Sequence, residues 1–371
     1  MFRFLSLTAG TLCVGIWTFL ALFRGGFWRL RERVRLGGSC PKAAVVAIIP
    51  ARDEALTIGD TVRSLRGQTH EFRIVVADDE SSDGTGAVAV AAGAELVRVP
   101  PLPLGWKGKL WAVNAGIEAA GGDSDYLLLT DADIEYVSRE IVAGLLARAA
   151  EGFDLVSVMV RLRCESRAEK MLIPAFVFFF FMLYPPEWVR SGRGAAAAAG
   201  GCMLISCGML EKIGGIAAIR DALIDDCALA QAVRKVGGRV WLGIAKDEVR
   251  SIRDYGTAAE IRAMISRSAF AQLRHSAWLL AGTVLGLVVT YLLPPALLFS
   301  GDRVSVALGL IAWLVSAILF APTVRLYRAP LWTIFCLPVI AGFYLVATVE
   351  SALSYWNGKG GRWKGRVQDA S

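Results

Sequence analysis

Long uncharged apolar runs lie near both ends of the chain. The first run, residues 4–23, reads FLSLTAGTLCVGIWTFLALF. A helix of about 20 such residues crosses the hydrocarbon core of a bilayer, so the run predicts a membrane span. A signal peptide is the alternative, but the run is long and no small-residue cleavage site precedes Arg24. Three further runs, at 278–299, 304–321 and 331–353, predict spans late in the chain.

The middle of the chain has a different pattern, in which short apolar runs alternate with helical segments. Runs such as AAVVAIIP at 43–50 end in polar turns, as buried parallel strands do. The predicted strands are 43–50, 73–77, 95–99 and 126–130, and the predicted helices are 55–67, 85–92 and 110–120. This alternation predicts a Rossmann-like α/β fold with a mostly parallel sheet, whose ligands bind beyond the carboxyl ends of the strands.

These patterns divide the chain into consecutive segments. We expect a transmembrane helix at 1–27, a basic linker at 28–42, an α/β domain at 43–255, an amphipathic interfacial segment at 256–276, transmembrane helices at 277–355 and a basic tail at 356–371. The interfacial segment places Arg262, Arg267 and Arg274 among apolar residues; an ordinary half-buried helix is the alternative. Residues 175–186 (AFVFFFFMLYPP) look too short to span and predict another interfacial segment.

Composition sets this chain apart from ordinary soluble enzymes. Hydrophobic residues make up 55% of its 371 residues, and the mean hydropathy is +0.50. There are only two histidines, and the seven cysteines form no CxxC pair. Multi-histidine zinc sites are therefore excluded, and the cysteines are expected to be reduced and mostly buried. Any metal must be held by carboxylates, which favours Mg²⁺ or Mn²⁺.

Basic residues follow the first apolar run and predict its orientation. They are Arg24, Arg29, Arg31, Arg33 and Arg35, with Glu32 as the only acid among them. The positive-inside rule then places the following domain in the cytoplasm. Four spans would leave the carboxyl terminus outside, whereas Lys359, Arg362, Lys364 and Arg366 favour the inside. Either the tail departs from the rule or one apolar run is re-entrant or interfacial. Anionic lipid explains the basic pI better than nucleic acid does.

Acidic residues follow three of the predicted strands. The pairs are Asp53 with Glu54, Asp78 with Asp79, and Asp131 with Asp133. Because parallel strands end at the same edge of a sheet, we expect these carboxylates to gather there. If residues 131–133 are extended, both aspartates point to one side, where a metal could bind and neutralise a diphosphate leaving group. Such a pair also occurs in solvated loops, so its position after a buried strand carries the prediction.

Five segments in sequence order resemble the family 2 glycosyltransferases of GT-A fold. They are IIPARDE at 48–54, VVADDESSDGT at 75–85, LLLTDAD at 127–133, GGCMLISCGMLEKIGG at 200–215 and LIDDCALAQAVRKVGGRV at 223–240. Residues 100–116 (PPLPLGWKGKLWAVNAG) and the membrane layout resemble the bacterial hopene-associated glycosyltransferases, and more distantly ceramide glucosyltransferase. The resemblance implies a GT-A catalytic domain with one N-terminal and about three C-terminal transmembrane helices.

The resemblance also implies roles for individual residues. Asp226 would be the general base that deprotonates the acceptor hydroxyl, supported by Asp225 where the family usually has glutamate. Charges that favour a helix N-terminus are the alternative for both residues. The nucleotide sugar would be bound by Pro50, Arg52, Glu54, Asp78, Asp79, Lys109 and Asp131, and the metal by Asp131 and Asp133. Lys109 could instead be a solvated lysine, and Trp106 would line the donor cleft or merely pack its loop.

Two departures from the family pattern narrow the expected function. Ser206 and Cys207 stand where relatives often carry arginines, which implies that an acceptor-loop or phosphate contact is lost or supplied elsewhere. The Q-x-x-R-W motif of processive synthases is absent, because Gln272 and Arg274 are two apart and His275 replaces the tryptophan. This disfavours polymer synthesis.

The resemblance implies an inverting, metal-dependent enzyme that adds one sugar from a nucleotide-sugar donor to a hopanoid-type or sphingolipid-like membrane lipid. Its partners would be the donor, the lipid acceptor and the bilayer, with Mg²⁺ or Mn²⁺ as cofactor and no nucleic acid. Transfer to a polyprenyl phosphate and a catalytically silent lipid-binding scaffold are the alternatives.

Overall fold

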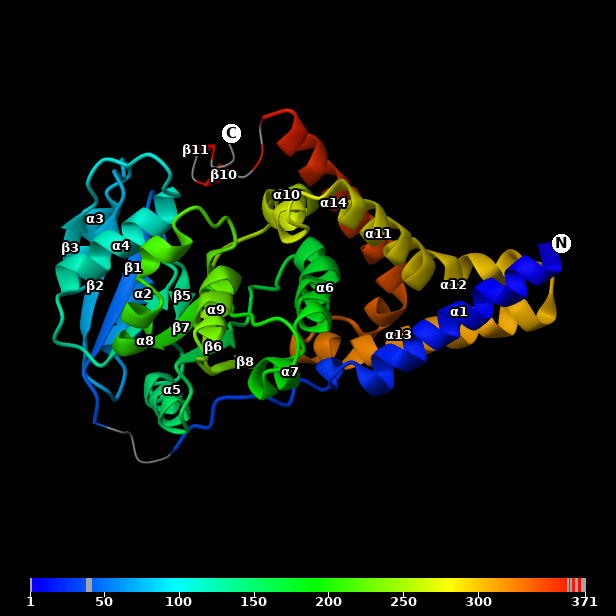
Figure 1. Ribbon diagram of the computed structural model, residues 1–371, viewed down its shortest axis with the longest axis horizontal. Helices are drawn as coiled ribbons and strands as arrows, with labels where there is room; N and C mark the ends of the chain where they lie inside the picture. Colours follow the sequence, from blue (N-terminus) through cyan, green and yellow to red (C-terminus); the bar gives the residue numbers. More distant parts are fainter. Residues whose placement is uncertain (1, 38–41, 359, 361, 364–365, 368–371) are drawn as a thin grey trace.

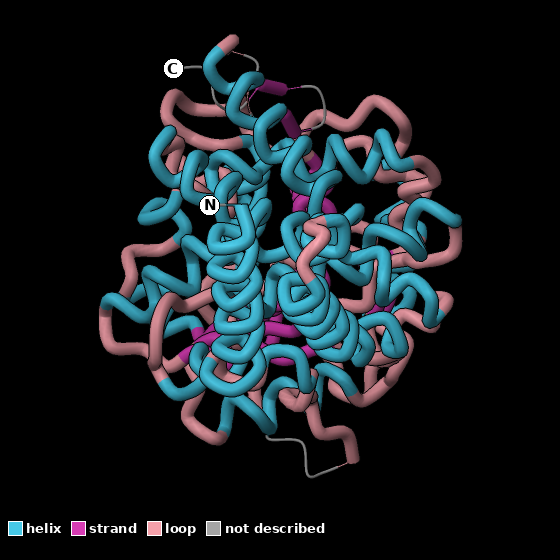
Figure 2. Tube along the Cα trace, turned by 90° about the vertical axis from the view of Figure 1, so that its right-hand side faces the viewer, coloured by secondary structure: helices cyan, strands magenta, loops and turns pink. Residues whose placement is uncertain are grey.

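The structure is a computed structural model that describes residues 2–37, 42–358, 360, 362–363 and 366–367. Residues 38–41 of the predicted linker, and Lys359 and Lys364 of the predicted tail, lie outside the described residues. An α/β domain forms one end of the molecule, and long helices extend from it toward the other end (Figure 1). A view from the helical end shows these helices in front of the strands (Figure 2).

A seven-stranded sheet with the order β3-β2-β1-β4-β7-β6-β8 forms the centre of the domain. Its strands are β1 (Val45–Ala51), β2 (Arg73–Asp78), β3 (Glu95–Arg98), β4 (Tyr126–Thr130), β6 (Leu155–Met159), β7 (Cys202–Ser206) and β8 (Val240–Ile244). β7 runs antiparallel to β4 and β6, whereas the other neighbours are parallel. Every residue of β1 is buried, which explains its uninterrupted apolar pattern. The predicted mostly parallel α/β fold is confirmed.

Helices and short elements complete the domain. They are α2 (Ile58–Arg66), α3 (Thr85–Ala91), α4 (Gly108–Ala120), α5 (Ile141–Ala150), α8 (Cys207–Lys212), η2 (Ile216–Ile219), α9 (Asp225–Lys235), and the small sheet of β5 (Ile134–Glu135) and β9 (Arg250–Ser251). α4 packs closely on β1, because a Cβ at Gly116 would lie 2.8 Å from Cγ2 of Ile48. This close packing holds the first turn of α4 at the carboxyl end of β1.

In the part of the chain that the structure describes, five helical segments are long and apolar enough to cross a membrane: Arg3–Phe23, Arg167–Ser191, Ala277–Phe299, Arg303–Leu326 and Leu331–Trp356. Their elements are α1 (Phe2–Phe23), α6 (Arg167–Leu183), α7 (Pro186–Ser191), α11 (Ala277–Leu287), η3 (Val288–Leu292), α12 (Leu293–Ala296), η4 (Leu297–Phe299), α13 (Arg303–Leu326), η5 (Leu331–Cys336) and α14 (Leu337–Trp356). The helix α10 (Ala258–Gln272), the short helix η1 (Phe27–Arg29) and a hairpin of β10 (Arg362–Trp363) and β11 (Arg366–Val367) are also present.

α1 and α13 lie side by side and run in the same direction, from the far end of the bundle toward the domain (Figure 1). At the end far from the domain, Arg3 forms an ion pair with Asp302, with Nε 2.9 Å from Oδ1. At the domain end, Arg24 donates hydrogen bonds to the backbone oxygens of Met182 and Leu183. Arg328, just after α13, forms an ion pair there with a loop of the domain. Each of these two helices therefore extends from the far end of the bundle to the α/β domain.

α6 begins at Arg167, where Ser166 caps it, and so starts eight residues before the apolar run at 175–186. The judgement that residues 175–186 are too short to span is thus wrong about length. The helix nevertheless cannot cross a membrane once, because β6 before it and β7 after it pair in the same sheet. In addition, 61% of the most apolar stretch within Arg167–Ser191 is buried inside the protein. α6 is therefore a buried helix between the domain and the long helices.

The last apolar segment turns back partway along the bundle. Nε1 of Trp313, in the middle of α13, donates a hydrogen bond of 3.0 Å to the backbone oxygen of Phe335 in η5. α14 then returns to the domain end, where the backbone N–H of Phe270 in α10 donates to Ser351 Oγ at 3.0 Å. Both ends of Leu331–Trp356 consequently lie at the domain end of the bundle. The segment thus returns to the end from which it began, as the re-entrant alternative expects.

Candidate active site

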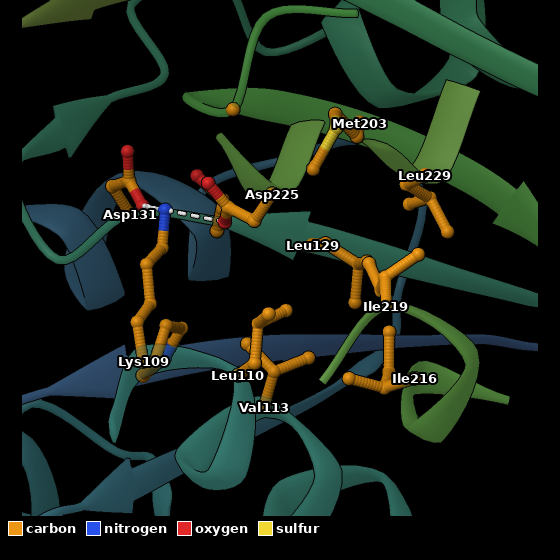
Figure 3. Close-up of a pocket in the computed structure, with 13 residues that line it drawn as sticks. Lys109, Leu110, Val113, Leu129, Asp131, Met203, Ile216, Ile219, Asp225 and Leu229 are labelled. Carbon is orange, nitrogen blue, oxygen red and sulfur yellow. Dashed lines mark ion pairs between the residues drawn. The ribbon is translucent and has the colours of Figure 1, made fainter. Parts of the chain in front are cut away.

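Lys109 connects two carboxylates at the carboxyl edge of the sheet. Its Nζ lies 2.8 Å from Oδ1 of Asp131, just beyond β4, and 2.9 Å from Oδ2 of Asp225 in the first turn of α9. Figure 3 shows the lysine side chain reaching the two acids. Burial lowers the pKa of Lys109, but the two carboxylates raise it further, so its pKa lies above the usual range. The ammonium group is therefore charged.

An apolar pocket lies beside this charged group (Figure 3). Leu110, Val113 and Leu129 line it together with Pro50 at the end of β1. Such a wall keeps the local dielectric low, which strengthens the ion pairs of Lys109. Pro50, predicted to bind the nucleotide sugar, thus shares a pocket with the predicted residues Lys109 and Asp131.

Asp133 is turned toward a different cation. Its Oδ2 accepts hydrogen bonds of 2.9 Å from Ser251 Oγ and from Arg253 Nε. Nη2 of Arg253 also lies 2.5 Å from Oε1 of Glu54. Residues 131–133 are not an extended segment, because residues 132 and 133 form a turn. The expectation of an extended pair of aspartates is therefore wrong, and the two acids contact separate cations.

The two aspartates remain close enough to interact. Burial raises the pKa of Asp131 most, Lys109 opposes that shift, and the negative charge of Asp133 adds to it. An unfavourable interaction between two carboxylates is the situation that a divalent cation between or beside them relieves.

The carboxyl ends of β1 and β2 are joined by an ion pair. Nη1 of Arg52 lies 2.8 Å from the backbone oxygen and 3.1 Å from Oδ2 of Asp79, a residue that is 2% exposed. Asp78 accepts a backbone N–H from its own loop at 3.1 Å. Asp53 and Glu80 in these loops have φ angles of 50° and 56°. Such strained positions persist where the surroundings hold them, which is common at functional sites.

Asp226 lies beside Asp225 in the first turn of α9. Its Oδ2 accepts a hydrogen bond of 2.9 Å from the backbone N–H of Gly200, and its Oδ1 one of 2.7 Å from that of Cys227. Burial, followed by the charge of Asp225, raises the pKa of Asp226 to about 7. A carboxylate that merely stabilised a helix N-terminus would have a lowered pKa. The arrangement provides a proton acceptor near neutral pH.

Residues near Asp226 contact the ends of α6 and α10. Nε2 of Gln272, the last residue of α10, donates to the Tyr184 hydroxyl at the end of α6. Tyr184 also interacts with Cys227, the neighbour of Asp226. The candidate proton acceptor therefore lies next to α6 and α10, which pack against α14.

Other singled-out residues lie away from this cluster. Ser206 pairs with Tyr126 at the start of β4, since β7 runs antiparallel, and its side chain caps α8. Ser206 and Cys207 therefore lie at the opposite edge of the sheet from the candidate site, so the lack of arginines at these two positions removes no contact from that site. Trp106 packs edge-on against Trp111, with ring centroids 5.0 Å apart, as in the packing alternative.

The sequence analysis missed Ser251, Arg253, Gly200 and Tyr184. Arg253 follows Asp133 by 120 residues, and no motif around it indicates that the two side chains meet. A search for cations near the acidic strand ends could not have selected it among the arginines of the chain.

Carboxylates outnumber cations in this cluster. The acids are Glu54, Asp79, Asp131, Asp133, Asp225 and Asp226, and the cations are Arg52, Lys109 and Arg253. Among residues 2–37 and 42–358, no group of three histidine, cysteine or acidic side chains could hold a metal ion by itself. Two of these carboxylates, together with phosphate oxygens of a ligand, could hold a Mg²⁺ or Mn²⁺ ion.

Part of the domain is similar to known glycosyltransferases. The family model "Glycosyl transferase family 2" matches residues 46–214. The 4,4'-diaponeurosporenoate glycosyltransferase of Staphylococcus haemolyticus is 35% identical over 94 residues, which cover 25% of this chain and 24% of that protein. Its counterpart in Staphylococcus aureus (strain MRSA252) is 33% identical over 104 residues, or 28% of this chain and 27% of that protein. The chain thus matches about a quarter of the length of these curated relatives.

A solved structure resembles almost the whole chain. It is the mannosyltransferase PcManGT from Pyrobaculum calidifontis in complex with GDP-Man and Mn²⁺, with a TM-score of 0.60 and 18% sequence identity. The likeness covers 94% of this chain and 99% of that one. The glycosyltransferase fold expected from the sequence is confirmed, including its helical part.

Proposed function

We propose that this protein transfers a sugar from a nucleotide-sugar donor to a lipid acceptor at the membrane surface. The match of residues 46–214 to the family 2 glycosyltransferase model supports the transferase part of this proposal. The placement of Asp226 carries the proposal. This half-buried carboxyl has a pKa raised to about 7 and lies between the Lys109 cluster and the helices α6 and α10. A donor on one side and an acceptor on the other would meet at this residue.

On the donor side, cations would bind the diphosphate of the nucleotide sugar. Lys109 is already charged and positioned by Asp131 and Asp225. Arg52 holds Asp79 in place for the nucleotide base. A Mg²⁺ or Mn²⁺ ion held by Asp131 and Asp133 would neutralise negative charge on the departing diphosphate. Arg253 would keep the Asp133 carboxylate oriented for that ion.

On the acceptor side, Asp226 would act as the general base. It would take the proton from the acceptor hydroxyl while that oxygen forms a bond to the anomeric carbon of the sugar. The bond from this carbon to the diphosphate oxygen would break on the opposite face, so the configuration would invert. Asp225 would support the reaction by holding Lys109 toward the donor.

The charge of the site favours a neutral hydroxyl as the acceptor. Asp225 and Asp226 would repel the phosphate of a polyprenyl phosphate, whereas they can accept a hydrogen bond from an alcohol. A hopanoid-type or sphingolipid-like alcohol at the membrane surface meets this condition.

The test is an assay of the purified full-length protein in lipid vesicles. A radiolabelled nucleotide sugar is supplied together with membrane lipids extracted from cells that lack the protein. We expect label to enter the lipid phase and nucleoside diphosphate to be released in equal amounts. Release without any labelled lipid would contradict transfer to a lipid, and absence of both products with every nucleotide sugar would contradict an enzyme.

We also propose that the α/β domain lies in the cytoplasm at the inner membrane of a bacterium. α1, Ala277–Phe299 and α13 would each cross the bilayer, and Leu331–Trp356 would enter and leave on one side. The arginines after α1 and the basic residues of the tail would then share the cytoplasmic side, in agreement with the positive-inside rule.

Cysteine labelling tests this orientation. Arg303 is the first residue of α13, and Asn357 directly follows α14; both are exposed. In intact cells, Arg303→Cys should react with an impermeant thiol reagent, whereas Asn357→Cys should react only after permeabilisation. The unmodified chain gives the background from its own cysteines. Labelling of Asn357→Cys in intact cells would contradict the re-entrant arrangement.

A further inference from the structure

A second cavity, of ≈ 540 Å³, lies where α1 meets the α/β domain. The last turn of α1, the turn around η1, and α7 form its walls. Its volume is within the range of small-molecule binding sites, about 300–1,000 Å³. None of its lining residues belongs to the candidate active site.

The cavity has one apolar and one basic wall. Leu22 and Phe23 at the end of α1 are 66% and 65% exposed and continue the apolar surface of a helix long enough to span a bilayer. The basic wall contains Arg29, Arg31, Arg190 and Arg193, which exceed its acids Glu32 and Glu187 in number. The cavity therefore combines an apolar surface with positive charge.

Some of these arginines are available for a ligand. Glu32 is already engaged, because its Oε1 lies 3.0 Å from Nε of Arg190 and its Oε2 accepts a hydrogen bond of 3.0 Å from Trp241. Within the described part of the chain, Arg29, Arg31 and Arg193 form no ion pair. Three guanidinium groups can thus donate hydrogen bonds to an anion.

Packing between α1 and the end of α6 shapes the cavity. The guanidinium of Arg24 donates to two backbone oxygens at the end of α6 and lies 4.7 Å from the ring centroid of Trp188. Gly25 has a φ of 60°, and a Cβ there would lie 2.9 Å from Pro185 and Trp188. These contacts fix the direction in which the chain leaves α1. The walls are consequently held in place before any ligand binds.

We propose that this cavity binds the headgroup of an anionic phospholipid. The phosphate contacts Arg29, Arg31 and Arg193, and an acyl chain follows Leu22 and Phe23 along α1. Guanidinium groups bind phosphate through paired hydrogen bonds, and basic pockets next to membrane helices recognise acidic headgroups in this way. A soluble anion would use the basic wall but would leave the apolar wall exposed to water, which favours a lipid.

The bound lipid is separate from the acceptor. Helix α9 connects the cavity with the candidate active site. Nη2 of Arg234 in α9 donates a hydrogen bond to the backbone oxygen of Val189 in α7, which forms a wall of the cavity. Asp226 lies eight residues earlier, about 12 Å along the helix axis. The lipid would instead fix the junction between α1 and the domain. This inference is independent of the proposed transferase activity.

Native mass spectrometry of the delipidated full-length protein in detergent tests the proposal. With equal amounts of phosphatidylglycerol and phosphatidylcholine, we expect one phosphatidylglycerol molecule to be retained at least tenfold more strongly. The double variant Arg29→Gln/Arg193→Gln should lose this retention by at least tenfold. The matched control Arg33→Gln/Arg35→Gln removes the same charge from exposed arginines that do not line the cavity, and should retain the lipid.

Each other result would overturn the proposal. Equal loss in both double variants would indicate diffuse surface charge, and unchanged retention in the cavity variant would place the lipid elsewhere. Displacement of the lipid by millimolar inorganic phosphate would indicate a site for a soluble anion. If the glutamine variant does not fold, the double variant Arg29→Lys/Arg193→Lys replaces it. A smaller loss of lipid retention is then expected, because lysine keeps the charge but not the paired hydrogen bonds. No loss of retention would again contradict the site.

Discussion

Replacing Asp226 with asparagine is expected to slow sugar transfer by a factor on the order of 10² to 10⁴, the usual effect of losing a general base. Asparagine keeps the shape of the side chain and can still accept the hydrogen bond from Gly200, but it cannot take a proton. The donor cluster around Lys109 and Asp131 is unchanged. The affinity for the nucleotide sugar, measured by calorimetry, should therefore remain within about threefold of the original value, a change of under 1 kcal/mol.

The pH dependence of transfer provides an independent readout. Because only the ionised carboxylate accepts a proton and burial raises the pKa of Asp226 to about 7, the rate should increase as the pH rises through 7. Asp226→Asn should lack this increase. Asp221→Asn, an exposed acid just before α9, is the matched control and should keep both the rate and its pH profile. If a folded Asp226→Asn protein retained most of its rate, Asp225 would be the next candidate for the base.

Removal of divalent metal is expected to reduce transfer to background. Without an added cation, the site has more carboxylates than cations, and the diphosphate of the donor adds further negative charge. Binding and departure of the diphosphate then lack the charge neutralisation they need. The assay is label transfer after treatment with EDTA and after readdition of Mg²⁺ or Mn²⁺, which should restore activity. Full activity in excess EDTA would contradict the proposed metal.

Variants of single acids locate the metal. Asp133→Asn should raise the Mn²⁺ concentration needed for half-maximal activity by at least tenfold, because it removes one of two proposed ligands. Asp123→Asn changes an exposed acid in the loop before β4, at the opposite end of that strand from Asp131, and should leave that concentration unchanged. Equal effects of the two substitutions would show that the requirement reflects bulk charge rather than a bound ion.

The sequence predicted the sheet edge that carries the candidate site. The strands β1, β2 and β4 were recognisable because each is an apolar run ending in a polar turn, and parallel strands with short crossovers must end on the same side. The acids after these strands therefore had to lie near one another. The helix that carries Lys109 was likewise predicted, since α4 begins within two residues of the expected start.

The direction of β7 in the sheet could not be predicted from the sequence pattern. The segment CMLIS is apolar and buried in either direction, so periodicity alone does not show that it pairs antiparallel with β4. That pairing carries Ser206 to the opposite edge of the sheet while Gly200 remains next to Asp226. The direction is set by how α6 returns the chain to the sheet, which is a property of the whole fold.

Hydropathy and charge order are local properties, because each depends only on neighbours along the chain; the sequence by itself therefore determined the apolar helices, the alternation of strands and helices, and the acidic strand ends. Contacts between distant segments decided the rest. Arg253 meets Asp133 across 120 residues, and Phe335 meets Trp313 partway along α13. Burial at the meeting of α9 with Gly200 raises the pKa of Asp226. These contacts and this pKa depend on which surfaces pack against each other and exclude water, and the packed chain alone determines that.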